Sequence, residues 1–447
     1  MASGKNGRRL NRKSDLDMRA FRAAQVVRKR MRTDRKEITR VGYIPEPSTP
    51  LGLLQDAGIV AAYNPDPTAR RALVPSGAKL PKGRPNLLLT LAPELGFLIG
   101  VDVSHSEVSV SVTRADFSQV VEEVRRVPIE GLDETPDRAL DAAARLIRDL
   151  VGELEQSDGL SPEKVIGIGL GLPGPVDRRT RTIAPNMNIL SMWSQHKPTE
   201  ELSSRLADCL PEVPIEIDND ASLGAVGIYS YLTLSLGIPP DQVPRDLLYV
   251  RVSDGIGAGV VIKGKLVGGG AGFAGEIGHV KVDDRGSFCP RCGQRGCVET
   301  KTSERAVLAE LKQVVFEAKP DELTIEQVLE STHPASFRSL HEAGWHLGAA
   351  LAHARTLLDP TRIYIGGPMA QSTHFVSGVH MGIISNSLGH SSDPEAEVRR
   401  VVIPVPKEFA KVRPDLRSPE LLGAIAMALH RAGDRHIERK LSQFQAG

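Results

Sequence analysis

Three of the four cysteines in this chain of 447 residues fall within nine positions, in the stretch CPRCGQRGC. Cys289 and Cys292 have the C-x2-C spacing with which two thiolates bind one ion from a tight turn, and the glycines that follow permit the turn that brings Cys297 back. His279, ten residues before Cys289, adds an imidazole. Three thiolates and an imidazole form a closed set typical of structural zinc, whereas catalytic zinc needs an open position. We therefore predict one structural Zn²⁺ bound by His279, Cys289, Cys292 and Cys297; the alternative is a group of buried or reactive cysteines.

Sequence landmarks on both sides of this cluster resemble those of the ROK family, which groups bacterial sugar-responsive repressors with sugar kinases. The landmarks are, in chain order, GLGLPGPVD, APNMN, IDNDA, SDGIGAGV, GEIGH, the cysteine motif CPRCGQRGCVET, RIYIGG and LLGAIAMAL. The resemblance covers roughly residues 85–430. One departure is the spacing of the first two cysteines, which is C-x-C in many family members, although both spacings suit zinc.

The resemblance implies a site for the hydroxyl groups of a hexose. Carried over motif by motif, its residues are Asn186, Asn219, Asp220, Glu276, His279 and Glu299. A sugar needs several fixed hydrogen-bond partners, which carboxylates and amides provide. One ring nitrogen of His279 would bind the metal and the other would face the sugar, so that zinc orients the site without touching the ligand. The alternative is that these polar residues are helix caps or surface groups.

The sequence departs from the family's kinases where those enzymes hold phosphate. Asp220 occupies the position of the kinase general base, and Asp102 survives in the first hairpin, where kinases carry Asp-x-Gly-Gly-Thr. Ser104 and His105 replace the two glycines, and their side chains would obstruct the close approach of a polyphosphate. Asp254 adds a negative charge in the second glycine-rich loop. We predict a lost ATP site and a retained sugar site, with no catalytic residue and Asp220 as a vestigial general base. A hexose kinase with a divergent phosphate loop is the alternative.

Charge divides the chain into two parts. Residues 1–90 hold 19 Lys and Arg against 7 Asp and Glu, whereas residues 91–447 hold 37 against 48. A basic N-terminal module on an acidic body indicates an anionic partner. The first forty residues lack the apolar segment of a signal peptide. Pro93 and Glu94 interrupt the most hydrophobic stretch, so we expect no membrane span. The few, clustered cysteines favour a reducing, cytoplasmic location.

The basic region has the layout of a winged helix-turn-helix, which ROK repressors carry before the same body. We expect a disordered arm over residues 1–13, helices from Ser14, over 34–43 and over 45–60, and two strands between residues 58 and 75. Ser48 or Thr49 would cap the third helix, which enters the major groove in such domains. PKGRPN resembles an AT-hook, whose arginine enters a narrow minor groove; the alternative is a proline-rich linker. The expected DNA contacts are Ser48, Thr49, Arg70, Arg71, Lys82 and Arg84.

The body shows the same succession of elements twice. The sequence predicts strands at 97–104, 107–115, 120–129, 164–175 and 214–220, and again at 246–252, 257–264, 265–269 and 362–367. Alternation is clear at 107–115, and 164–175 is a continuous buried run. Long helices are predicted at 135–156 and 335–358. We predict an α/β chain in which the winged helix-turn-helix precedes a two-lobed, actin-like (ribonuclease H-like) fold. Residues 1–86 would form the DNA module and linker, 87–220 the first lobe, and 221–419 the second lobe with the zinc site. The helix at 420–447 would return to the first lobe.

These features favour a sugar-responsive transcriptional regulator whose effector is a hexose or sugar phosphate. Its partners would be double-stranded promoter DNA and further copies of the chain, since the family is mostly dimeric or tetrameric. Besides the kinase, the alternative is a regulator that has lost direct DNA binding, because Pro50 and Gly52 disfavour a regular third helix.

Overall fold

The computed structural model describes residues 3–31, 33–63, 88–129, 136–184, 192–234, 243–314, 323–387, 398, 402–405 and 418–446. Within these ranges, the side chains of residues 3–14, 234, 313 and 314 are not described. No helix in the described part of the chain is long and apolar enough to cross a membrane.

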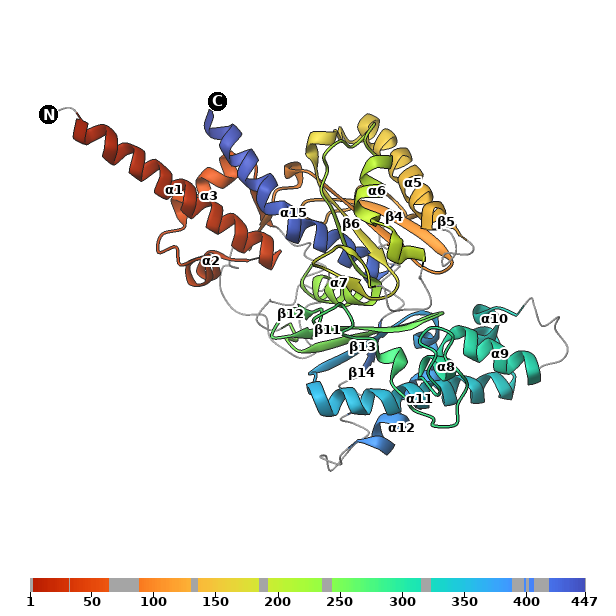
Figure 1. Ribbon diagram of the computed structural model, residues 1–447. Helices are drawn as coiled ribbons and strands as arrows, with labels where there is room; N and C mark the ends of the chain where they lie inside the picture. The colour runs from red at the N-terminus through yellow and green to blue at the C-terminus, as the bar shows by residue number, and fades with distance from the viewer. Residues whose placement is uncertain are drawn as a thin grey trace.

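In its described residues, the N-terminal module comprises three helices and a two-stranded sheet (Figure 1). Its elements are α1 (Ser3–Arg30), α2 (Arg35–Gly42), α3 (Ser48–Asp56), β1 (Val60–Tyr63) and β2 (Leu88–Leu91). Apolar side chains from all three helices, among them Val27, Ile38 and Leu54, form its buried core. The three helices and the following strand match the layout expected of a winged helix-turn-helix. The described partner of β1 is β2, which pairs with it antiparallel.

Two local predictions for this module were wrong. The first helix begins at Ser3, so the residues expected to form a disordered arm are largely helical. The third helix is capped neither by Ser48 nor by Thr49: its N-cap is Pro47, and no side chain caps it. Pro50 lies in the first turn, where its missing N–H leaves no intrahelical hydrogen bond unmade. The helix is therefore regular despite Pro50 and Gly52.

The body contains two five-stranded sheets with the same strand order and directions. In the first lobe the order is β5-β4-β3-β6-β9, and in the second it is β12-β11-β10-β13-β14. Each sheet has antiparallel pairing on one side of its central strand and parallel pairing on the other. The strands are β3 (Phe97–Val103), β4 (Glu107–Arg114), β5 (Arg125–Pro128), β6 (Val165–Leu172), β9 (Ile215–Asn219), β10 (Leu247–Val252), β11 (Ile256–Ile262), β12 (Lys265–Val267), β13 (Arg362–Gly366) and β14 (Val402–Pro404). This repetition confirms the predicted two-lobed α/β architecture.

Helices cover the two sheets and fill the space between the lobes (Figure 1). The first lobe carries α5 (Pro136–Ser157) and α6 (Pro198–Arg205). The second lobe carries α8 (Glu299–Thr302), α9 (Glu304–Val314), α10 (Ile325–Glu330), α11 (Pro334–Leu358) and α12 (Thr373–Asn386). Two short antiparallel strands, β7 (Val176–Asp177) and β8 (Thr182–Ile183), follow β6.

Two helices, α7 (Asp220–Leu234) and α15 (Pro419–Ala446), pack against each other between the sheets. Glycines allow this close packing. A Cβ on Gly423 would lie 1.8 Å from the carbonyl oxygen of Leu223, and one on Gly169 would lie 1.9 Å from that of Ala424. The helix α15 thereby rests on β3 and β6 of the first lobe.

The N-terminal module is fixed to the body through α15. The guanidinium of Arg28, which is only 2% exposed, donates to the carbonyl oxygens of Leu429 and His430, and its Nη2 lies 2.8 Å from Oδ2 of Asp434. Nearer the start of α1, Asp17 accepts a hydrogen bond from Gln445 at 2.6 Å. Figure 1 shows the two helices side by side. Because the Arg28 charge is buried and paired, the contact between α1 and α15 is a specific one.

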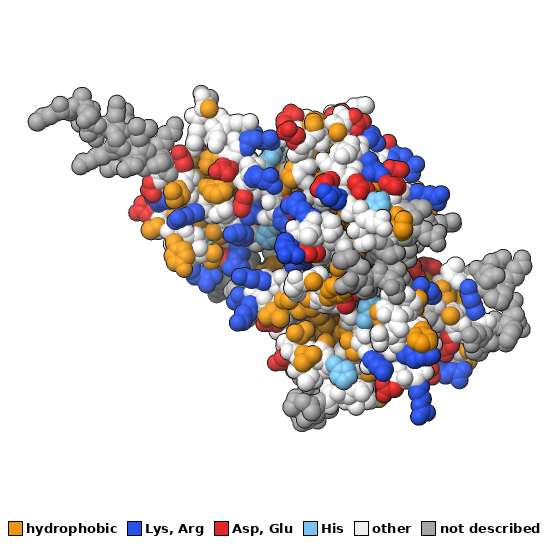
Figure 2. Space-filling model, in the orientation of Figure 1, with side chains coloured by type: hydrophobic (Ala, Val, Ile, Leu, Met, Phe, Trp, Pro, Cys, Tyr) orange, Lys and Arg blue, Asp and Glu red, His pale blue; other side chains and the backbone are white. Residues whose placement is uncertain are grey.

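An open cavity of about 930 Å³ lies where the module meets the second lobe. Its charged lining residues are all basic: Arg22, Lys29, Arg30, Lys263 and Lys265. Figure 2 shows Lys and Arg side chains gathered along this junction. The positive potential of the N-terminal module thus continues onto the body.

Candidate functional site

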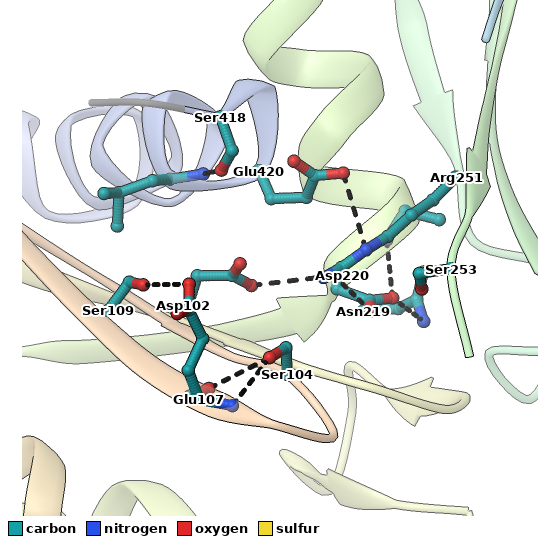
Figure 3. A network of polar contacts seen from close by, with 12 residues as sticks. Asp102, Ser104, Glu107, Ser109, Asn219, Asp220, Arg251, Ser253, Ser418 and Glu420 are labelled. Carbon is teal, nitrogen blue, oxygen red and sulfur yellow. Dashed lines mark hydrogen bonds and ion pairs between the residues drawn. The ribbon is translucent and has the colours of Figure 1, made fainter. Parts of the chain in front are cut away.

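A buried network of charged side chains occupies the space between the lobes (Figure 3). Arg251 on β10 is its centre. Its Nη1 lies 2.6 Å from Oδ2 of Asp220 and 3.9 Å from Oδ1 of Asp102, and its Nε lies 3.7 Å from Oε1 of Glu420. Tyr249 donates to the same oxygen of Glu420 at 2.6 Å. One guanidinium therefore faces three carboxylates that come from β3, α7 and α15.

Burial and mutual repulsion favour the protonated forms of these carboxylates. Desolvation raises the pKa of Asp102 to about 7 against the lowering effect of Arg251, and the negative charges of Glu420 and Asp220 raise it further. Burial likewise raises the pKa of Asp220. The network holds more carboxylates than Arg251 can neutralise.

The side chains of Asp220 and Asn219 already form hydrogen bonds within the protein. One oxygen of Asp220 accepts from the backbone N–H of Ala221 at 2.7 Å and from the amide of Asn219 at 3.1 Å, while the other accepts from Arg251. The Asn219 side chain also donates to the carbonyl of Gly174, and its oxygen accepts from the N–H of Ser222 at the start of α7. Both residues thus stabilise the first turn of α7.

Five of the six residues expected to contact a sugar line one pocket of about 40 Å³: Asn219, Asp220, Glu276, His279 and Glu299. Asn186 lies outside the described residues. Oε2 of Glu299 accepts from the backbone N–H of Ile256 at 3.1 Å, whereas Oε1 is buried and accepts no hydrogen bond. Burial, together with the charges of Asp220 and Glu299, raises the pKa of Glu276 to about 7. The pocket therefore offers hydrogen-bonding groups to a polar ligand.

The predicted metal ligands form a compact cluster beside this pocket. The ligand atoms of His279, Cys289, Cys292 and Cys297 all lie within 4.8 Å of one another. Nδ1 of His279 lies 3.7 Å from Sγ of Cys289, and Sγ of Cys292 lies 3.4 Å from that of Cys297. Such spacings suit four ligands around one ion at the bond lengths of zinc. The donor set therefore fits a structural metal ion.

The loop geometry explains how His279 reaches both the cysteine cluster and the pocket. Its Nδ1 faces the cysteines, and its Nε2 lies 3.9 Å from Oε2 of Glu276 at the pocket. Gly296 has φ +71°, and a Cβ there would lie 1.6 Å from the carbonyl oxygen of Asp283, so only glycine allows this return of the chain to Cys297.

The turn between β3 and β4 differs from an open phosphate loop. Oγ of Ser104 accepts from the backbone N–H of Glu107 at 3.0 Å and donates to its carbonyl oxygen at 3.1 Å. His105 projects into the pocket, where Nη2 of Arg291 lies 3.0 Å from its Nε2. Burial and the charges of Arg291 and Arg251 lower the pKa of His105 to about 3, so the ring is neutral.

Sequence reasoning missed Arg251, Glu420 and Arg291. Arg251 is the one charged residue in the strand LLYVRV, and Arg291 is one of the two residues between Cys289 and Cys292. Both features are visible in the sequence, but neither shows where the side chain points. Glu420 comes from a segment some two hundred residues after Asp220, so its place beside Arg251 depends on the tertiary fold.

The expected DNA contacts fall into two groups. Ser48 and Thr49 are exposed in the first turn of α3, where they are accessible to a ligand. Arg70, Arg71, Lys82 and Arg84 lie outside the described residues.

Comparison with known proteins identifies the family. The model of the ROK family matches residues 98–400. A xylose repressor of Caldicellulosiruptor bescii is 28% identical over 298 residues, which cover 64% of this chain and 69% of the repressor. A glucokinase of Streptomyces coelicolor is 25% identical over 301 residues, which cover 63% of this chain and 85% of the kinase.

A solved structure supports the fold over nearly the whole length. The crystal structure of a ROK family transcriptional regulator, described as a homologue of the Escherichia coli Mlc protein, matches with a TM-score of 0.65 and 18% identity. The match covers 96% of this chain and 99% of that one, and so includes the N-terminal module. With a family match over most of the body and the same fold around it, the chain belongs to the ROK family.

Proposed function

We propose that the protein is a sugar-responsive, DNA-binding transcriptional regulator. The observation that carries this proposal is the joining of two parts in one chain: a basic three-helix module, and a body whose interlobe pocket brings together five of the residues expected to hold a sugar. The repressors among its relatives support the same assignment.

In this proposal the N-terminal module binds promoter DNA. The exposed start of α3, with Ser48 and Thr49, would lie in the major groove. Arg70, Arg71, Lys82 and Arg84 would contact the phosphate backbone and minor groove. A homodimer or homotetramer would present two such modules to two half-sites.

The effector would bind in the interlobe pocket, through Asn186, Asn219, Asp220, Glu276, His279 and Glu299. A sugar or sugar phosphate that prefers one arrangement of the lobes would shift the population of that arrangement, and with it the affinity for DNA. A single structural Zn²⁺ held by His279, Cys289, Cys292 and Cys297 would fix the direction of His279 and of the neighbouring carboxylates.

We further propose that the protein is not a kinase. A general base must be free to accept a proton from the sugar hydroxyl, but Asp220 is bound to Arg251 at 2.6 Å. Ser104 closes the turn that would have to receive phosphate. The glucokinases among the relatives make a direct test worthwhile. ATP turnover with D-glucose that disappears in Asp220→Asn would contradict the proposal.

Fluorescence anisotropy with labelled DNA from the protein's own promoter region tests the regulatory function. We expect saturable binding that weakens steeply with salt, since each phosphate contact releases counterions, and a change in affinity when D-xylose or D-glucose is added. Deleting residues 1–86 should abolish binding. Absence of salt-dependent binding by the full chain would refute the assignment.

A further inference from the structure

Arg291 occupies the pocket assigned above to the sugar. It stands between Cys289 and Cys292, yet its side chain points away from the metal cluster and is only 10% exposed. Its Nε lies 3.0 Å from Oε1 of Glu299, and its Nη2 lies 3.0 Å from Nε2 of His105. Since His105 belongs to the first lobe and Glu299 to the second, one guanidinium joins the two lobes across the pocket.

The guanidinium also lies along one side of a small pocket. A Cβ on Gly255 would lie 2.7 Å from Nη1 of Arg291, so the side chain lies directly over the glycine-rich loop that follows β10. The volume of the pocket is only about 40 Å³. Ligand sites are generally several times larger. The pocket in this arrangement is therefore too small for a hexose, and Arg291 is one of the side chains that line it.

The contact between Arg291 and Glu299 leaves hydrogen bonds unmade. Nε of Arg291 and Oε1 of Glu299 are both buried, and neither makes a hydrogen bond even though they are 3.0 Å apart. The two charges attract, but the N–H does not point at the oxygen. A ligand hydroxyl directed at this oxygen would supply the missing donor, while a displaced arginine would regain hydrogen bonds from water.

We propose that Arg291 is an internal competitor of the effector. In the ligand-free protein it binds Glu299 and holds His105, which keeps the lobes together. A sugar displaces it from Glu299 and thereby releases the bridge to the first lobe. Arg291 lies between two of the predicted metal ligands, so the competitor is part of the metal-binding loop. This inference rests on the proposed sugar site, but the bridge that Arg291 forms between the lobes can be tested without any ligand.

The direction of an affinity change distinguishes a competitor from a residue that holds the sugar. Calorimetric titration of Arg291→Ala with D-xylose and D-glucose should show about tenfold tighter binding than the wild type for whichever sugar binds. Weaker or equal binding by the variant would overturn the proposal. Arg295→Ala is the matched control: Arg295 lies in the same loop but stacks on Phe288, its guanidinium carbon 3.6 Å from the ring centroid, outside the pocket. Its affinity should equal that of the wild type.

Hydrogen exchange measured by mass spectrometry tests the bridge without ligand. Arg291→Ala and His105→Ala should each speed amide exchange at residues 104–107, whereas Arg295→Ala should not. Unchanged exchange in Arg291→Ala would refute the bridge. If neither sugar binds any form, the sugar part of the proposed function fails for these sugars, and the exchange result alone decides whether Arg291 holds the lobes. Metal content and far-UV circular dichroism verify that each variant is folded.

Discussion

At the scale of single residues, the charge balance of the interlobe network is its most consequential property. Arg251 is shared by Asp102, Asp220 and Glu420, and all four side chains are largely removed from water. A low-dielectric environment strengthens repulsion among ionised carboxylates as much as it strengthens attraction to Arg251. Proton uptake is the simplest relief, so the stability of this network depends on pH.

We predict that stability falls as pH rises through the range in which Asp102 ionises. Its pKa is raised from 3.8 to about 7 in the folded protein. The folded state therefore holds a proton that the unfolded chain releases at lower pH, and stability is lost between pH values near 4 and 7. Urea unfolding at pH 5 and pH 7 should show this loss for the wild type and a smaller one for Asp102→Asn. An equal pH dependence in the two proteins would show that Asp102 is not the group responsible.

We predict that Cys292→Ser abolishes the effector response before it unfolds the N-terminal module. Loss of one thiolate weakens metal binding, and the loop that orients His279, Glu276 and Glu299 then loses its constraint. Metal analysis should show loss of stoichiometric zinc, and anisotropy should show DNA binding that no longer responds to sugar. Cys209→Ser, which alters the cysteine outside the cluster, is the control. Undiminished sugar binding by Cys292→Ser would contradict the role assigned to the metal.

The site residues that sequence could predict were those carried by spacing or by motif. The C-x2-C pair and His279 indicated a metal cluster from chemistry alone, and the structure brings the four ligands together. Arg291 could not be placed in the pocket in this way. Spacing shows that a residue is present between two cysteines, but the direction of its side chain depends on the turn around it and on Gly255 opposite.

At the scale of elements, α3, the helix proposed to enter the major groove, contains a glycine that its backbone does not require. Gly52 lies in the middle of the helix, and a Cβ there would meet nothing within 4 Å. Gly58, just past the helix, also has open space around it, but its φ is +63°. The two positions therefore separate the effect of helix propensity from that of backbone conformation.

We predict opposite effects of alanine at these two positions. Gly52→Ala should stabilise the module by about 0.5–1 kcal/mol, because alanine loses less backbone entropy in a helix. Gly58→Ala should destabilise it by about 1 kcal/mol, because its φ is left-handed. Hydrogen exchange of the α3 amides reports both changes locally. Changes of the same sign would show that α3 is not the regular helix described here.

The sequence predicted elements well where periodicity was strong and poorly where it was absent. The strands of the two lobes were predicted from alternation at 107–115 and from apolar runs such as the one at 164–175, and the structure confirms their repeated order. The start of α1 was missed because GKNGRRLNRK has no apolar stripe on which a helix prediction could rest. The pairing of β1 with β2 was also missed, because a contact between residues some thirty apart leaves no local pattern.

At the scale of the whole molecule, one helix contacts both the interlobe network and the N-terminal module. The first turn of α15 supplies Glu420 to the interlobe network, and its later turns hold Arg28 of the N-terminal module through Asp434. Fourteen residues of helix separate these two carboxylates, a span of about 21 Å. The helix α15 therefore joins the network to the module without an intervening loop.

We predict that Arg28→Ala uncouples DNA binding from the effector. The variant loses a part-buried ion pair and two hydrogen bonds to α15, so the orientation of the module on the body is less firmly fixed. Anisotropy should show intrinsic DNA binding that persists while the effect of sugar on it shrinks. Arg19→Ala is the control, since Arg19 contacts Glu46 within the module and not α15. A full sugar response in Arg28→Ala would exclude this contact as the route of coupling.

The position of α15 in the chain also has a consequence for biosynthesis. The N-terminal module is translated before the body, whereas α15 follows the whole body and emerges from the ribosome last. Apolar residues of α15, among them Leu429 and Leu441, belong to the same buried cluster as the apolar residues of the module. Domains generally fold in the order in which they are made, but this module lacks part of its buried surroundings until α15 has been made. Its Arg28 also has no Asp434 to pair with before then, so the module takes its place on the body only when synthesis of α15 is finished.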